Sequence, residues 1–534
     1  MKPDLKKISV TTWIALGGIF LYTVSLWQRS LFVSEFADGS FTALLPRGGC
    51  LPAARFLDDF LSACSVSTPL FFRLPTVLLT LFAAGVLFFA GKESTFKNAS
   101  RSGALIFLLT PAVFLGSTAV SPLLRNGALL TAAVFALFAL IESKNFISLA
   151  VSSFIALLTL TVSALLFSGN LILPGAFLLT AVYLVLRGML FPSVALAGAK
   201  FCVFPPFLPG AKICFFLLFL PGAFLLRGAD FATLFTLPSA TAFKEFAAFA
   251  IAGSFPWVLF WLPASKNTKE RLTALLNEPF TLFAFTAVLV SLAGILFTTQ
   301  TVTWAVLFVA GSAVLLGTAL EMEYVENGNA AFNKLLWFLA VLFFIAAALI
   351  GTYSLLGLYT KMLKPAWKLL TAKDAWALTA VVPVVTGVWW LTAAGEKIHK
   401  ERKFLAFCAG IAFALLAFHG LVPLKVIENN SPVRFFNQAV QKRLNRSTVI
   451  YCDQALLLPA KQVFRRSEIK LFSATPKETD ELKRLAKSAQ SACVLTTSSQ
   501  ISKKLPFPKT TLRSGRFFAV FYNIDLPEMR MRKP

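Results

Sequence analysis

The sequence predicts a polytopic α-helical membrane protein with about 13 transmembrane helices and a small C-terminal extracytoplasmic α/β domain. Hydrophobic residues make up 57% of the chain and charged residues only 14%, and the mean hydropathy is +0.74. Apolar stretches of roughly 20 residues, enough to cross a hydrocarbon core, recur through the N-terminal four-fifths of the chain. Function is therefore to be sought at a membrane face.

Apolar runs bounded by charge, Pro or Gly define the predicted spans. In chain order they are 8–28, 69–90, 103–120, 123–141, 146–167, 171–187, 211–226, 245–263, 279–297, 301–319, 334–355, 376–394 and 403–423. The stretch 188–210 is interrupted by several prolines, which break any continuous helix there.

Clusters of Lys and Arg set the predicted orientation, because short basic loops resist translocation. Such clusters precede the first span and follow the second, eighth and twelfth, so all lie on one side if the spans alternate. The N-terminus is therefore predicted to be cytoplasmic and the C-terminal domain to lie outside. One loop is an exception, because its four lysines fall on the outer side and either weaken this topology or bind an anion: Lys361, Lys364, Lys368 and Lys373.

The composition changes near residue 425, which divides the chain into a transmembrane domain, 1–424, and an α/β domain, 425–534. In the second part, charges are frequent and short apolar runs alternate with polar ones. The predicted strands are Thr448–Cys452, Ile469–Phe472, Cys493–Thr497 and Phe517–Tyr522. Pro476–Ser488 is predicted to be a helix, with acidic residues early and basic residues late, as the helix dipole favours.

Charge and cysteine content limit the possible partners. The net charge of +25 is explained largely by cytoplasmic loops that meet anionic membrane lipids, and no nucleic-acid motif accompanies it. No CxxC motif is present, so a metal cluster is not indicated. The pairs Cys50–Cys64 and Cys452–Cys493 are either disulfides of an oxidising compartment or buried free thiols.

The candidate site lies where charges gather at the outer ends of the predicted spans. Arg73, Arg125 and Lys244 enter the second, fourth and eighth spans, and the long first outer loop, 29–68, adds further charges. Guanidinium groups match phosphate oxygens, so Arg73, Arg125, Arg55 and Lys244 are predicted to bind the phosphate of a lipid. The alternative is ordinary anchoring at the interface by snorkelling side chains.

Two carboxylates of the first outer loop are the predicted catalytic residues, Glu35 and Asp38. They are three residues apart and would share a face of a helix. A carboxylate can act as a base or hold a metal, so the pattern leaves a divalent cation open without identifying one. Two exposed acids on a loop are more often simply solvated charges, and of the two we favour Glu35 as the working acid.

Several short runs resemble the glycosyltransferases of the protein-mannosyltransferase and aminoarabinose lipid A transferase (ArnT-like) family. Phe72–Leu78 looks like the Arg-Leu-Pro opening of that family's second span, and Ala252–Trp257 looks like its Gly-x-x-Pro-Trp helix. Ser431-Pro432, followed by Thr448–Tyr451, resembles the start of its outer domain. The resemblance implies an enzyme of the inner (plasma) membrane, with a periplasmic C-terminal domain, that moves a sugar from a polyprenyl-phosphate carrier to lipid A, another glycolipid or a protein.

The chain departs from the family pattern where the chemistry would occur. Of the acidic pair after the first span only Glu35 is present, preceded by Ser34. The acid expected at the fourth span is replaced by Asn126, and the Thr-Lys-Gly near the sixth span reads Ser168-Gly169-Asn170, without lysine.

Two main hypotheses follow. In the first, the protein is a glycosyltransferase that uses a polyprenyl-phosphate sugar donor. In the second, it is a catalytically inactive pseudo-glycosyltransferase that binds carrier lipid or scaffolds a membrane partner. A transporter is disfavoured, because no internal repeat is evident and the middle of the spans is nearly free of charge.

Overall fold

The structure is a computed structural model that describes most of the chain from residue 70 onwards. The described residues are 70–92, 97–117, 122–143, 146–166, 172–190, 277–298, 300–327, 329–359, 373–395 and 400–421, a few positions between 243 and 257, and most of 432–523. The first outer loop and the predicted spans 8–28 and 211–226 lie outside these residues, as does most of the span 245–263.

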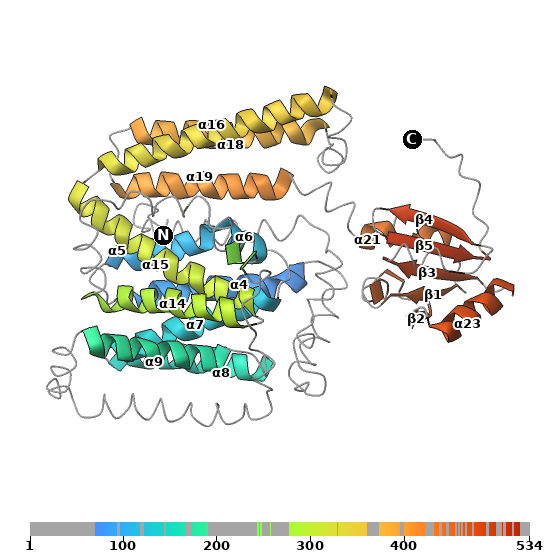
Figure 1. The fold of residues 1–534 in the computed structure, drawn as a ribbon, viewed down its shortest axis with the longest axis horizontal. Coiled ribbons are helices and arrows are strands. Elements are labelled where there is room, and N and C mark those ends of the chain that lie inside the picture. Colours follow the sequence, from blue (N-terminus) through green and yellow to red (C-terminus); the bar gives the residue numbers. More distant parts are fainter. Residues whose placement is uncertain are drawn as a thin grey trace, which may run out of the picture.

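The N-terminal part is a bundle of apolar helices (Figure 1). Its helices are α4 (Leu70–Ala90), α5 (Lys97–Leu109), α6 (Pro111–Ser117), α7 (Pro122–Glu142), α8 (Phe146–Leu166), α9 (Ile172–Leu190), α14 (Pro279–Phe297), α15 (Thr301–Asn327), α16 (Asn329–Tyr359), α18 (Lys373–Gly395) and α19 (Lys400–Leu421). Each predicted span in the described part of the bundle coincides with a helix or a helix pair. The third span is divided at Thr110-Pro111 into α5 and α6, because proline has no backbone N–H to donate to a helical hydrogen bond.

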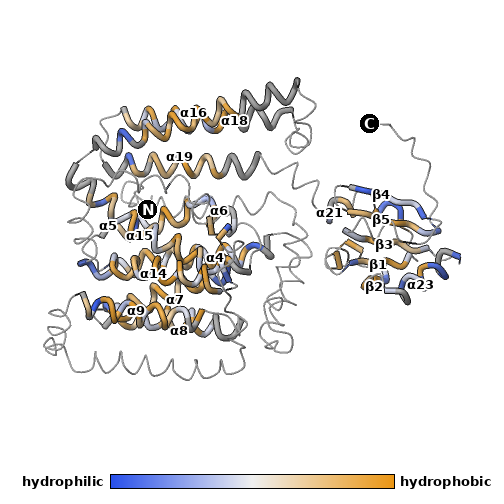
Figure 2. The backbone as a smooth tube through the Cα atoms, viewed as in Figure 1, coloured by the Kyte–Doolittle hydropathy of each residue, from blue (hydrophilic) through white to orange (hydrophobic). Residues whose placement is uncertain are grey.

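Four of these helices are long and apolar enough to cross a membrane by length and composition within the described residues: α4, α7, α14 and α15. Figure 2 shows that apolar residues fill the middle of the helices and that hydrophilic residues lie mainly near their ends. The fold is therefore that of a polytopic helical membrane protein, as predicted, and the total of about 13 spans stays a prediction.

Helix α7 lies at the centre of the packing, and 94% of its apolar stretch is buried. In contrast, α8 presents large apolar side chains outward, including Ile147, Phe154 and Leu157. An apolar face that is exposed in a membrane helix is the face that meets lipid. The bundle thus has a protein-facing centre at α7 and a lipid-facing flank at α8.

The C-terminal part folds as a five-stranded sheet with helices, shown in Figure 1 beyond the end of α19. Its elements are α21 (Pro432–Phe435), a 3-10 turn (Gln441–Arg443), β1 (Val449–Cys452), β2 (Ile469–Leu471), α23 (Pro476–Lys487), β3 (Ala492–Thr496), β4 (Thr510–Ser514) and β5 (Phe517–Tyr522). The strand order is β2-β1-β3-β5-β4, with β2, β1 and β3 parallel and β5 antiparallel to its neighbours β3 and β4. The predicted α/β domain is therefore present, and the boundary at 424/425 stays a prediction.

Two apolar cores cover the two faces of this sheet. Ile450, Cys452 and Cys493 belong to one core, and Val449, Tyr451 and Val494 belong to the other, as the alternation of side chains along a strand requires. Helix α23 begins with a capping box, in which the Thr475 amide donates to the Glu478 carboxylate (3.0 Å) and the Glu478 amide donates to Thr475 Oγ1 (3.4 Å).

The structure decides between the two alternatives for one cysteine pair. Cys452 and Cys493 are both buried, and neither takes part in a disulfide. The strand register pairs Cys493 with Ile450 and Cys452 with Leu495, so the two cysteines are not opposite each other. Of the two alternatives for this pair, the structure therefore excludes the disulfide. Cys50 and Cys64 lie outside the described residues.

Candidate functional site

Arg73 and Arg125 lie at the same end of the bundle. The last turns of α4 and α7 meet at one cavity, which is lined by Phe89 and Lys92 from the end of α4 and by Ala139 and Glu142 from the end of α7. The two helices also pack against each other. Because they pack together and their last turns meet, they run in parallel. Their first turns, which carry Arg73 and Arg125, must then lie together about 30 Å away, since a helix rises about 1.5 Å per residue. We call this the arginine end and the other the Glu142 end.

The start of helix α15 lies at the arginine end, where two glycines of neighbouring helices let it approach closely. A Cβ at Gly127 of α7 would lie 2.6 Å from Val306 Cβ and 2.9 Å from the Thr303 carbonyl oxygen. A Cβ at Gly175 of α9 would lie 2.8 Å from the Trp304 ring. The first turns of α15 therefore fit against α7 at Gly127 and against α9 at Gly175, because both positions lack a side chain.

Both arginines are shielded from solvent, with exposed fractions of 1% for Arg73 and 0% for Arg125. Charged side chains within membrane spans are rare because removing them from water is costly, and they commonly mark functional sites. The parallel arrangement of α4 and α7 brings two guanidinium groups to one end of the bundle. Their forked N–H groups suit phosphate oxygens.

Four neutral polar side chains at the arginine end carry buried atoms with no hydrogen-bond partner among the described residues. They are Thr76 Oγ1, Asn126 Oδ1, Gln300 Oε1 and Trp304 Nε1. Thr76 follows Arg73 on α4, Asn126 follows Arg125 on α7, and Gln300 and Trp304 belong to the start of α15. Leaving a buried polar group unsatisfied costs about 1–3 kcal/mol, so a cluster of them indicates a place where a polar ligand or water binds.

The other predicted site residues are placed differently. Lys244 is exposed rather than buried with the two arginines, and the nearby Phe246 packs edge-on against Phe308 of α15 at 5.2 Å. Glu35, Asp38 and Arg55 lie outside the described residues, so their roles stay predictions. In the part of the chain that the structure describes, no three His, Cys, Asp or Glu side chains converge as metal ligands.

A polar cluster at the Glu142 end was not predicted from the sequence. Arg187 of α9 forms an ion pair with Glu142 of α7, and the Tyr183 hydroxyl donates a hydrogen bond to the same carboxylate at 3.1 Å. The Phe283 ring packs edge-on against the Tyr183 ring of this cluster, with the ring centroids 5.0 Å apart. Both charges lie at the ends of predicted spans, and this position is the sequence feature that could have identified them. Their pairing was not evident because 45 residues separate them in the sequence.

Comparisons with known proteins place the fold. No family model matches the chain, and no curated protein matches its sequence. Two crystal structures of ArnT from Cupriavidus metallidurans are similar, one in the apo state and one bound to undecaprenyl phosphate. Each has a TM-score of 0.64 and 15% sequence identity, over 96% of this chain and 98% of that chain.

The chain has the ArnT fold. The similarity spans both the helical bundle and the C-terminal domain, which confirms the expected resemblance at the level of architecture. At 15% identity the similarity to ArnT concerns the fold, and the chemistry must be argued from this chain's own residues.

Proposed function

We propose that this protein is a membrane glycosyltransferase that takes a sugar from a polyprenyl-phosphate carrier and transfers it to a lipid or protein acceptor. The observation that carries the proposal is the arginine end, where Arg73 and Arg125 are buried beside partnerless polar atoms of α4, α7 and α15. The ArnT fold supports it, because one of the similar structures is bound to undecaprenyl phosphate.

In this proposal the two arginines hold the phosphate of the carrier. The bond between the anomeric carbon and the phosphate oxygen breaks, and the electron pair stays on the phosphate, whose growing negative charge the guanidinium groups stabilise. An acceptor oxygen forms the new bond to the anomeric carbon. Its proton passes to a carboxylate, for which Glu35 is our candidate, and Asp38 is a second carboxylate of the same loop.

The orientation follows from the distribution of basic residues. We infer that the arginine end faces the outside and the Glu142 end faces the cytoplasm, which puts the sugar transfer and the C-terminal domain on the extracytoplasmic side of the inner membrane. Lipid A is one acceptor of suitable chemistry there. Lys244, exposed near the start of α15, is available to contact anionic lipid at that surface.

A catalytically inactive carrier-binding protein is a second candidate, and Asn126 favours it. The resemblance predicts an acid at this position, whereas the amide of Asn126 is neutral and its buried Oδ1 lacks a hydrogen-bond partner in the described part of the chain. Such a protein would bind carrier lipid through Arg73 and Arg125 without breaking the sugar–phosphate bond.

One experiment separates the two functions. Purified protein in nanodiscs is given a polyprenyl-phosphate sugar donor and a membrane-lipid acceptor fraction, and mass spectrometry measures the glycosylated product. A glycosyltransferase gives product in the wild type and much less in Glu35→Gln. Unchanged turnover in Glu35→Gln would remove Glu35 from the mechanism, and donor binding without any product would favour the inactive protein.

A further inference from the structure

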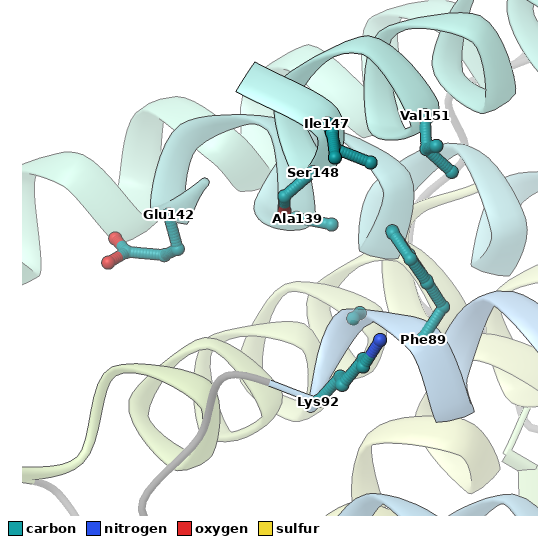
Figure 3. Close-up of a pocket in the computed structure, with 8 residues that line it drawn as sticks. Phe89, Lys92, Ala139, Glu142, Ile147, Ser148 and Val151 are labelled. Carbon is teal, nitrogen blue, oxygen red and sulfur yellow. The ribbon is translucent and has the colours of Figure 1, made fainter. Parts of the chain in front are cut away.

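A cavity of about 430 Å³ opens at the Glu142 end, between α4, α7 and α8. Figure 3 shows Phe89 and Lys92 of the α4 end on one side and Ile147, Ser148 and Val151 of α8 on the other. The lining is therefore amphipathic, with apolar side chains on both sides and, at what we call its mouth, the Lys92 amine and the Ser148 hydroxyl.

Among the described residues that line the cavity, the positive charge of Lys92 is not neutralised, because the nearby carboxylate points elsewhere. Glu142 lines the same cavity, but Figure 3 shows its carboxylate directed away from Lys92. It forms the ion pair with Arg187 and accepts the hydrogen bond from Tyr183. Lys92 is exposed, and no ion pair of its amine is found within the described residues.

The apolar side chains that α8 contributes to the cavity continue onto the lipid-facing side of the bundle. Ile147, Val151 and Phe154 follow one another at helical spacing on α8, and their exposed fractions are 76%, 39% and 65%. An acyl chain that begins at the cavity can therefore extend along α8 toward the bilayer centre.

We propose that this cavity binds one anionic phospholipid. Its phosphate lies near the Lys92 amine at the mouth, and one acyl chain lies along Phe89, Ile147 and Val151. Arg187 is a positioning residue, because it holds Glu142 away from Lys92 and so keeps the mouth cationic. This site lies at the opposite end of the bundle from Arg73 and Arg125, and it does not depend on the proposed transfer reaction.

The test is native mass spectrometry of the delipidated full-length protein in detergent. Dioleoylphosphatidylglycerol and dioleoylphosphatidylcholine are added separately, and the fraction of protein with one bound lipid is measured. The wild type is expected to prefer the anionic lipid. Lys92→Gln is expected to reduce its binding about fivefold and to leave phosphatidylcholine binding unchanged, since one lysine near an anionic lipid contributes about that factor.

Lys334→Gln is the matched control, because Lys334 is an exposed lysine near the start of α16 and does not line the cavity. It is expected to keep the wild-type preference. An equal loss in Lys92→Gln and Lys334→Gln, or no loss in Lys92→Gln, would overturn the proposal. Displacement of the bound lipid by an equal concentration of glycerol 3-phosphate would also overturn it, because the acyl chain would then contribute nothing.

Arg187→Gln tests the positioning role. Releasing Glu142 is expected to let it neutralise Lys92 and to lower phosphatidylglycerol binding as much as Lys92→Gln does. The double variant Glu142→Gln/Arg187→Gln removes both charges of the pair and is expected to restore binding. A double variant that binds as poorly as Arg187→Gln would contradict the role assigned to Glu142.

Discussion

Arg73 and Arg125 occupy the same position, the fourth residue, of two parallel helices that pack against each other, α4 and α7. Both side chains are buried. Because parallel helices place equivalent residues at the same depth, the two cations reach one end of the bundle from different elements. The proposed phosphate site thus follows from helix geometry rather than from closeness in sequence.

The approach of α15 to this end makes Gly127 sensitive to substitution. Gly127→Val should destabilise the bundle by about 1–3 kcal/mol, because its Cβ would collide with Val306 and with the Thr303 carbonyl. Thermal unfolding in detergent measures the loss. Gly85→Ala is the control, since a Cβ there has nothing within 4 Å, and it should be neutral or slightly stabilising. Equal effects of both substitutions would contradict the close α7–α15 contact.

The C-terminal domain should lose stability in acid through Glu481. The Tyr451 hydroxyl donates to its carboxylate at 2.7 Å, and this hydrogen bond, with Lys470 nearby, lowers the pKa of Glu481 below its ordinary value of 4.5. A carboxylate whose pKa is lower in the folded state stabilises the fold above the unfolded pKa, and that contribution is lost as the pH falls through the folded pKa. The stabilisation should therefore be present at pH 7 and fade below about pH 4.5.

Tyr451→Phe tests this interaction. Hydrogen exchange of the β1 amides should show a loss of about 0.5–1 kcal/mol at pH 7, a modest value because Glu481 is largely solvated. The difference from wild type should shrink in acid. Lys483→Gln, which removes the exposed pair with Asp480, is the control and should have almost no effect. A Tyr451→Phe difference that does not change with pH would contradict the role of Glu481.

Cys452 and Cys493 should behave as inert thiols. Burial raises the pKa of the Cys493 thiol, so little thiolate exists near neutral pH. Iodoacetamide should leave both cysteines unmodified in the folded protein and should alkylate both after denaturation without reductant, as measured by peptide mass spectrometry. Alkylation that requires a reductant would reveal a disulfide and contradict the structure.

The sequence predicted the helical bundle well because span boundaries are marked by charge, Pro and Gly. The predicted span 279–297 coincides with α14, whose Pro279 follows the N-cap Glu278. Strand β4 was missed, because Thr510–Ser514 is a mostly polar segment at the sheet edge and carries no apolar run. Figure 2 shows hydrophilic residues along it.

The candidate site was only partly predictable. Arg73 and Arg125 stand out in the sequence as charges that enter apolar spans, and the structure brings them to one end. The partnerless polar atoms of Thr76, Asn126, Gln300 and Trp304 could not be predicted, because they depend on how three helices pack. The pairing of Glu142 with Arg187 likewise depends on the contact between α7 and α9.

The central claim is that Arg73 and Arg125 hold the phosphate of a polyprenyl carrier. The most direct measurement is the dissociation constant of undecaprenyl phosphate for the wild type, Arg73→Gln, Arg125→Gln and the control Arg101→Gln, which alters an exposed arginine near the start of α5. A charge-assisted hydrogen bond contributes about 1.5–3 kcal/mol, so each of the first two variants should bind about 10–100-fold more weakly, with Arg101→Gln unchanged. Wild-type affinity in folded Arg73→Gln and Arg125→Gln would contradict the account.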